Sequence, residues 1–321
     1  MRSAAFVLIL LVSAEAVSQG QGCALTPGRT GRFETLSNAA GVVAFSSGLN
    51  VNADGAPNAY HRVLGPGVSD SGLLHICNGV AVLERDANGR MVNRYTDFSV
   101  RGTSAQCKAD VFALQERGFP SCDTGECLRI FGFFAPPRSC GPGGSNDCGV
   151  PPFATDANGA PTEFFVSTTS LADPAFAATD PRRYLDARSA PHFVLPGGES
   201  GPFGTQHGIR LGDVALIVQG NRGVFAVFGD AGPRDKLGEA SPAVITRLAG
   251  KPDITTKLPG AIASGVTTLV FPGSRAELAE MPPHSARVIA EAGQRALASA
   301  GGLAAFAGCL GLNTQVVIAG Q

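Results

Sequence analysis

Two acidic residues lie close together where a buried strand is expected to end. The apolar run 224–228 is followed directly by Gly229 and Asp230, and a turn around Gly232 then leads to Glu239. Glycoside hydrolysis needs such a pair, because one carboxyl protonates the leaving oxygen while another carboxylate activates water. A carboxyl at the end of an apolar strand is desolvated, which raises its pKa toward that of a general acid. We therefore take Asp230 as candidate acid and Glu239 as candidate base, with exchanged roles as the alternative.

The same spacing also has a purely structural interpretation. Asp230 could close a turn, and Glu239 could cap the helix expected after it. Gly229 is a position where a ligand could approach the backbone closely. From the spacing alone, the structural interpretation is favoured.

Strand patterns dominate the elements that would position these acids. The runs 214–218 and 224–228 are continuously apolar, which is typical of strands buried on both faces, and the short link 219–222 makes them a hairpin. Further strands are expected at 42–45, 73–83, 128–131, 164–167, 192–195 and 267–271, and helices at 107–117, 241–248 and 284–300. The fold class is therefore mainly β, a β-rich α+β fold with a few helices.

Two Asn-Gly pairs, at Asn88-Gly89 and Asn158-Gly159, predict hairpins with type I′ turns. Each follows an Asp-Ala pair, which resembles the start of a calcium loop. Neither segment continues with alternating acidic ligands or a terminal Glu, so turns are the better interpretation.

The cysteine pattern predicts disulfides in an oxidising compartment. The chain has 8 cysteines, and five of them lie between Cys107 and Cys148. The cluster has neither paired C-x-x-C spacing nor a histidine, so disulfides are favoured over zinc. We expect a cysteine-rich insertion at about 102–153, with at least one disulfide leaving it if all cysteines are oxidised.

The N-terminal residues have the features of a signal peptide. Arg2 precedes a short apolar run, and a small-residue cleavage site follows, so we expect cleavage after Ala16. Cys23 raises the alternative of a lipoprotein, but Gly20-Gln21-Gly22 lacks the aliphatic residue that such a signal needs. We therefore expect residues 17–321 to form a single secreted or periplasmic domain. In this part of the sequence, no run reaches the roughly 20 apolar residues of a membrane span.

The charge balance excludes some partners. There are 25 Lys and Arg residues against 26 Asp and Glu residues, a net charge of -1. Proteins that bind nucleic acids or anionic membranes usually carry more basic than acidic residues, so neither is an expected partner. No cofactor or metal is expected, and we expect a monomer.

Several segments together resemble a known family. They are Asp54 to His61, Phe165 to Leu171, Asp180 to Asp186, Pro191 to Pro196, Leu211 to Ala215, Gly229 to Ser241 and Val270 to Ser274. In order and spacing they are similar to glycoside hydrolase family 75, the chitosanases, over about residues 50–64 and 160–275. The resemblance implies a six-stranded barrel of double-psi type and an endo-acting, inverting hydrolase of chitosan or a related β-1,4 amino sugar polymer.

The resemblance also implies roles for particular residues. The Asp and Glu of the family's Gly-Asp-x-Gly-Pro…Gly-Glu stretch carry over to Asp230 and Glu239 as the catalytic pair. The matched segments supply the substrate-binding candidates Asp54, Tyr60, Tyr184, Asp186 and Asp213. The chain has 0 Trp, so Tyr60 and Tyr184 would have to stack on sugar rings. Each could equally be a core ring, and the three aspartates could equally close turns.

Two features depart from the family pattern. The 102–153 insertion has no counterpart in it, and the acids between Arg210 and Glu239 are offset by an equal number of bases, unlike a cleft for a polycation. The alternatives are a barrel that binds surface polysaccharide without cleaving it, and a hydrolase of cell-wall glycan. His61, His192 and His207 have no metal-ligand spacing, and without a Gly-x-Ser-x-Gly elbow a serine hydrolase is disfavoured.

Overall fold

The computed structural model describes residues 25–95, 100, 102–137, 149–156, 158–254 and 256–319. The expected signal peptide, residues 1–16, lies outside this part of the chain, as do Cys23, Cys140 and Cys148. In the described part, none of the helices combines the length and the apolar character that crossing a membrane would require.

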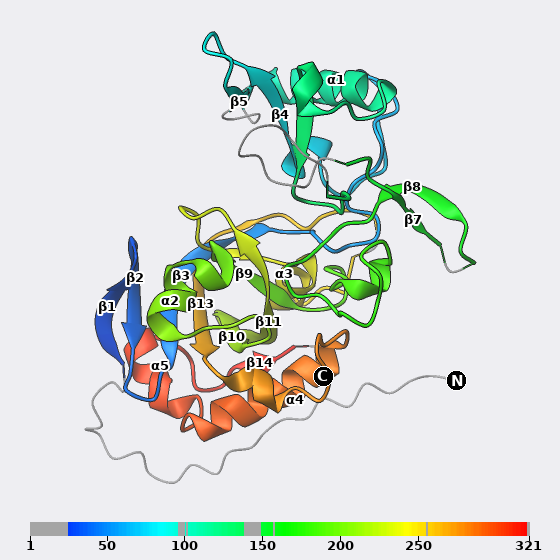
Figure 1. Ribbon diagram of the computed structural model, residues 1–321. Helices are drawn as coiled ribbons and strands as arrows, with labels where there is room; N and C mark the ends of the chain where they lie inside the picture. Colours follow the sequence, from blue (N-terminus) through cyan, green and yellow to red (C-terminus); the bar gives the residue numbers. More distant parts are fainter. Residues whose placement is uncertain are drawn as a thin grey trace.

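Six strands form a closed barrel (Figure 1). Around the ring they are β3 (Val43–Val51), β12 (Glu239–Ala240), β9 (His192–Pro196), β11 (Arg222–Gly232), β10 (Val214–Gln219) and β13 (Ile262–Phe271), and β13 pairs with β3 to close it. The pairs β9–β11 and β3–β12 are parallel, and the other four are antiparallel. The expected six-stranded barrel is confirmed.

The barrel strands are buried on both faces. On β10, Ala215 and Ile217 pack in the same core as Phe193 and Phe228, whereas Leu216 packs in a second core. That second core also contains residues of α4 (Ala286–Ser299) and α5 (Ala304–Leu310), which cover the outside of the barrel. The continuous apolar runs of β10 and β11 follow from this two-sided burial.

Smaller elements complete the barrel region. A hairpin of β1 (Thr26–Thr30) and β2 (Phe33–Ser37) extends the sheet beside β3, and β14 (Val317–Ile318) pairs with β11. Helix α2 (Pro202–His207) follows β9, and α3 (Pro242–Leu248) follows β12. Both helices begin with proline, which is favoured at the first helical position.

A second unit lies on the side of the barrel away from α4 (Figure 1). It contains β4 (Val80–Arg85), β5 (Met91–Asn93), β6 (Cys127–Ile130) and α1 (Thr103–Glu116). Disulfides join Cys77 to Cys107 and Cys122 to Cys127, so the first bond leaves the cysteine cluster as expected. Cys309 is also disulfide-bonded. The unit has its own core and includes residues 76–93, which precede the expected insertion.

Both Asn-Gly segments form hairpins, but the predicted turn type is wrong. They connect β4 with β5, and β7 (Phe153–Thr155) with β8 (Pro161–Phe165). Only the glycines, Gly89 and Gly159, have positive φ, whereas a type I′ turn needs positive φ at both central residues. Instead Asp86 and Asp156 accept hydrogen bonds from the backbone two and four residues ahead, which stabilises a longer loop.

Candidate active site

Asp230 and Glu239 lie on either side of one residue of β9. Val194 is the partner of Asp230 in the pair with β11 and of Glu239 in the pair with β12. Phe193 and Leu195 point into the barrel core, so Val194 and both acids point to the outer face. Because neighbouring strands are about 4.8 Å apart, the two Cα atoms are about 10 Å apart.

The Glu239 side chain extends back toward β11. A Cβ atom at Gly232 would lie 2.8 Å from Oε2 of Glu239 and 2.9 Å from Cγ1 of Val194. Gly232 is two residues beyond Asp230, a distance of about 7 Å along a strand. The Glu239 carboxyl therefore lies beside β11, on the same face as Asp230 and close to the strand position two residues beyond it.

Asp230 is buried and anchored through one oxygen. Its Oδ1 accepts hydrogen bonds from Ser170 N (2.9 Å), Ser170 Oγ (2.7 Å) and its neighbour Ala231 N (2.9 Å). Burial raises the pKa of Asp230, these hydrogen bonds oppose the rise, and the nearby Glu239 adds to it. Within the described residues Oδ2 accepts no hydrogen bond, so this oxygen is available to a ligand.

Asp54 brings a third carboxyl to the same place. It follows β3 and accepts a hydrogen bond of 2.6 Å from the hydroxyl of Tyr60 at Oδ1. Burial raises the pKa of Asp54 well above its ordinary value, and the charges of Asp230 and Glu239 raise it further. Tyr60 is fully buried, so it holds Asp54 and does not stack on a sugar ring.

The charges at the site are unbalanced. Lys236 Nζ lies 2.5 Å from Oε1 of Glu239 and forms an ion pair with it. Among the described residues, Asp54 and Asp230 form no ion pair. Arg210 bonds to the carbonyl of Gly204, and Arg222 lies against Gly250, so these bases do not neutralise the site. Among the described residues, Lys236 is the base that forms an ion pair with a carboxylate of the site.

The other substrate-binding candidates have structural partners. Asp213 accepts from the backbone N of Arg210 (2.8 Å) and Arg275 (3.1 Å), which closes a turn. Asp186 forms an ion pair with Arg188 at 2.7 Å. Tyr184 is buried and donates to the carbonyl of Ala178 at 3.0 Å. The structure thus joins Asp54 and Tyr60 to the catalytic candidates, and it gives Tyr184, Asp186 and Asp213 structural partners.

The glycine before Asp230 has a packing role. A Cβ atom at Gly229 would lie 2.8 Å from Cβ of His192 and from Cδ1 of Leu185, so Gly229 faces protein and not a ligand. His192 itself is buried, and burial lowers its pKa to about 4. His61 and His207 contact Glu163 and Thr30. In the part of the chain that the structure describes, no group of three or more His, Cys, Asp or Glu residues is arranged to hold a metal ion.

Sequence reasoning missed Ser170 and Gly232 as parts of the site. Ser170 lies within the segment 165–171 that carries the family resemblance, but no local pattern pairs a serine with an acid 60 positions later. Gly232 was expected only as a turn residue.

Neither a scan against protein-family models nor a search of curated proteins found a match to this chain.

Proposed function

We propose that this chain is an exported, endo-acting glycoside hydrolase that cleaves β-1,4 linkages in chitosan or a related amino sugar polymer with inversion. The observation that carries the proposal is the placement of Asp230 and Glu239 on opposite sides of Val194, with their carboxyls on one face. In an inverting glycosidase the two carboxyls stand roughly 6.5–9.5 Å apart, which leaves room for the attacking water molecule beside the base, the role proposed for Glu239. The disulfides agree with export, since they persist in oxidising compartments.

The electrostatics of the site support a cationic substrate. Asp54 and Asp230 bring two carboxyls that have no cationic partner among the described residues, and Glu239 has one lysine. The ammonium groups of glucosamine units would supply the missing positive charge. Glu239, held by Lys236, activates the water molecule, and a protonated carboxyl on the other side of the scissile bond protonates the leaving oxygen.

A reducing-end assay on chitosan tests the proposal. The wild type is expected to release oligomers, and Asp230→Asn and Glu239→Gln are each expected to lower turnover several hundredfold or more. Asp235→Asn, a loss of the same charge from an exposed neighbouring position, serves as the control. NMR of the first product should show the inverted anomer. Near-full activity in either active-site variant would refute the assignment.

A second candidate is a barrel that binds polysaccharide without cleaving it. The unit with the disulfides has a cavity of about 230 Å³ lined by Tyr95, Arg129 and Phe131, among others. The ring of Phe131 is 57% exposed, which is unusual for a large apolar side chain and suits stacking on a sugar. Retention on immobilised chitosan without product release would favour this function.

A further inference from the structure

Hydrolysis with inversion needs one protonated carboxyl. The hydrogen bonds around Asp54 differ from those around Asp230, and this difference indicates which of the two carries the proton. Asp230 accepts two backbone N–H bonds and one hydroxyl bond, all at Oδ1. A carboxylate with two or three such donors is stabilised in its charged form. Asp230 is therefore poorly suited to hold a proton at neutral pH.

Asp54 has the opposite surroundings. Its only short side-chain hydrogen bond comes from Tyr60, at Oδ1. Oδ2 faces the amide of Asn52 at 3.4 Å, a weak contact. A proton on Oδ2 leaves the Tyr60 bond intact, because the carbonyl oxygen of a carboxylic acid still accepts. The repulsion by ionised Asp230 and Glu239 also favours the neutral acid, as the direction of the Asp54 pKa indicates.

The position of Asp54 is fixed by contacts with both units. Gly55 N donates to Ser167 Oγ at 2.9 Å, and Ser170, three residues later, holds Asp230. The segment 167–170 thus anchors both acids. Cβ atoms at Gly79 and Gly132, beside β4 and β6, would lie 2.7 Å and 2.5 Å from atoms of the Tyr60 ring and hydroxyl. These two glycines allow Tyr60 to pack under Asp54.

We propose that Asp54 carries the proton of this carboxyl cluster and donates it to the glycosidic oxygen, while Asp230 remains ionised. The donor role rests on the proposed function. As the bond from the anomeric carbon to the glycosidic oxygen breaks, the Asp54 proton moves to that oxygen. A water oxygen bonds to the anomeric carbon and loses its proton to Glu239. Ionised Asp230 stabilises the positive charge of the transition state, and exchange with solvent returns the proton from Glu239 to Asp54.

The location of the proton is tested on the substrate-free protein. Infrared spectra at neutral pH are expected to show the carbonyl stretch of a protonated carboxyl in the wild type, and Asp54→Asn should remove it. Asp230→Asn should keep the band and move its loss to lower pH, because one neighbouring charge is gone. Asp213→Asn is the control for another buried carboxyl with a raised pKa. A band that survives Asp54→Asn but disappears in Asp230→Asn would overturn the proposal.

The donor role is tested with two leaving groups. Asp54→Asn should lower turnover on chitosan oligomers about a hundredfold or more, but lower it less than tenfold on a dinitrophenyl glycoside of the same oligomer, which needs no acid. Asp230→Asn should impair both substrates. The reverse pattern would overturn the donor role. Wild type that cleaves neither substrate would refute the proposed function, and the infrared result would still decide where the proton resides.

Discussion

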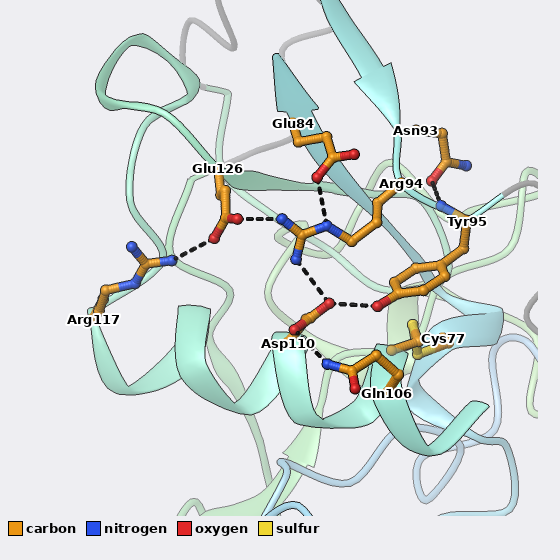
Figure 2. Close-up of polar contacts among 10 residues, drawn as sticks. Cys77, Glu84, Asn93, Arg94, Tyr95, Gln106, Asp110, Arg117 and Glu126 are labelled. Atoms are coloured by element: carbon orange, nitrogen blue, oxygen red, sulfur yellow. Dashed lines mark hydrogen bonds and ion pairs between the residues drawn. A yellow bond between two sulfur atoms is a disulfide. The ribbon is translucent and has the colours of Figure 1, made fainter. Parts of the chain in front are cut away.

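Two regions of the molecule each gather three carboxyl groups, and they differ in how the negative charge is compensated. Asp54, Asp230 and Glu239 meet on the outer face of the barrel. In the unit with the disulfides, Glu84, Asp110 and Glu126 surround the guanidinium of Arg94 (Figure 2). The first group has one cation at its edge, whereas the second has a cation at its centre.

In the cluster around Arg94, each carboxylate is paired with a cation. Arg94 contacts Glu84 at 2.7 Å and Asp110 at 2.8 Å and also pairs with Glu126, which contacts Arg117 at 3.3 Å. Although partial burial opposes it, hydrogen bonds from Tyr95 and Arg94 lower the pKa of Asp110. The barrel cluster shows the opposite direction at Asp54 and Asp230. Carboxyls with satisfied charge stabilise a fold, and carboxyls held without compensation are typical of functional sites.

Gly232→Ala gives the largest expected difference between the clusters. The new methyl group would lie 2.8 Å from Glu239 Oε2 and 2.9 Å from Val194 Cγ1, so the Glu239 carboxylate must move. Because displacements of about 1 Å at reacting groups cost on the order of a hundredfold, we expect turnover to fall by about that factor. Because the methyl group also presses on Val194, the free energy of unfolding, measured with urea, should fall by about 1–3 kcal/mol, and turnover is compared for the folded protein.

Gly28→Ala is the matched control for this prediction. A Cβ atom at Gly28 would have no neighbour within 4 Å. This variant should have wild-type turnover. Equal turnover in the two variants would mean that the position of the Glu239 carboxylate does not matter for the reaction.

Arg94→Met removes the cation at the centre of the Glu84, Asp110 and Glu126 cluster, so that this cluster also becomes uncompensated. Three carboxylates would then face one another across an uncharged side chain, which destabilises the unit. Glu84 and Glu126 are 39% and 43% exposed, so solvent screens the repulsion and the expected cost is about 1–2 kcal/mol. Urea unfolding measures it, and turnover of the folded fraction should be unchanged.

Arg90→Met provides the control for the arginine side chain. Arg90 pairs with Asp86 but is 74% exposed, and such surface pairs contribute within about 0.5 kcal/mol. Equal destabilisation by the two variants would contradict a special role for the Arg94 cluster.

The sequence allowed prediction of the elements that local patterns specify. Apolar runs predicted β10 and β11, the Ser-Pro pair predicted α3, and Gly301-Gly302 predicted the end of α4. The turn type failed at Asn88 and Asn158, because the preceding aspartates bond to the backbone and favour a longer loop. Those bonds depend on the side chain two positions earlier, which the Asn-Gly rule does not consider.

The composition of the site could be predicted only in part. Asp230 and Glu239 are near each other in sequence, but Asp54 and Ser170 reach them through the closure of the barrel and the 167–170 segment. The resemblance to a family identified matching segments of sequence but not which residues contact one another. Asp186 and Asp213 were therefore substrate-binding candidates on the same grounds as Asp54. Only the fold distinguishes an acid paired with arginine or backbone from one held beside other acids.

Opposite pH dependences of stability give the sharpest form of the comparison. Burial and neighbouring charges raise the folded-state pKa of Asp54 above 3.8, so the native state binds its proton more tightly and loses stability as pH rises from about 4 through that pKa. Asp54→Asn should therefore raise the free energy of unfolding at pH 7 and have little effect at pH 3. Asp110 has a lowered pKa, so its contribution is present above about pH 4 and is lost as pH falls through the folded-state pKa. Asp110→Asn should lower the free energy of unfolding at pH 7, and its effect should diminish toward pH 3. Urea unfolding at pH 3, 5 and 7 measures both differences.

If the two differences in unfolding free energy change with pH in the same direction, the two clusters are electrostatically alike. If they change in opposite directions, the protein gives up stability at Asp54 to keep an uncompensated carboxyl at its candidate active site.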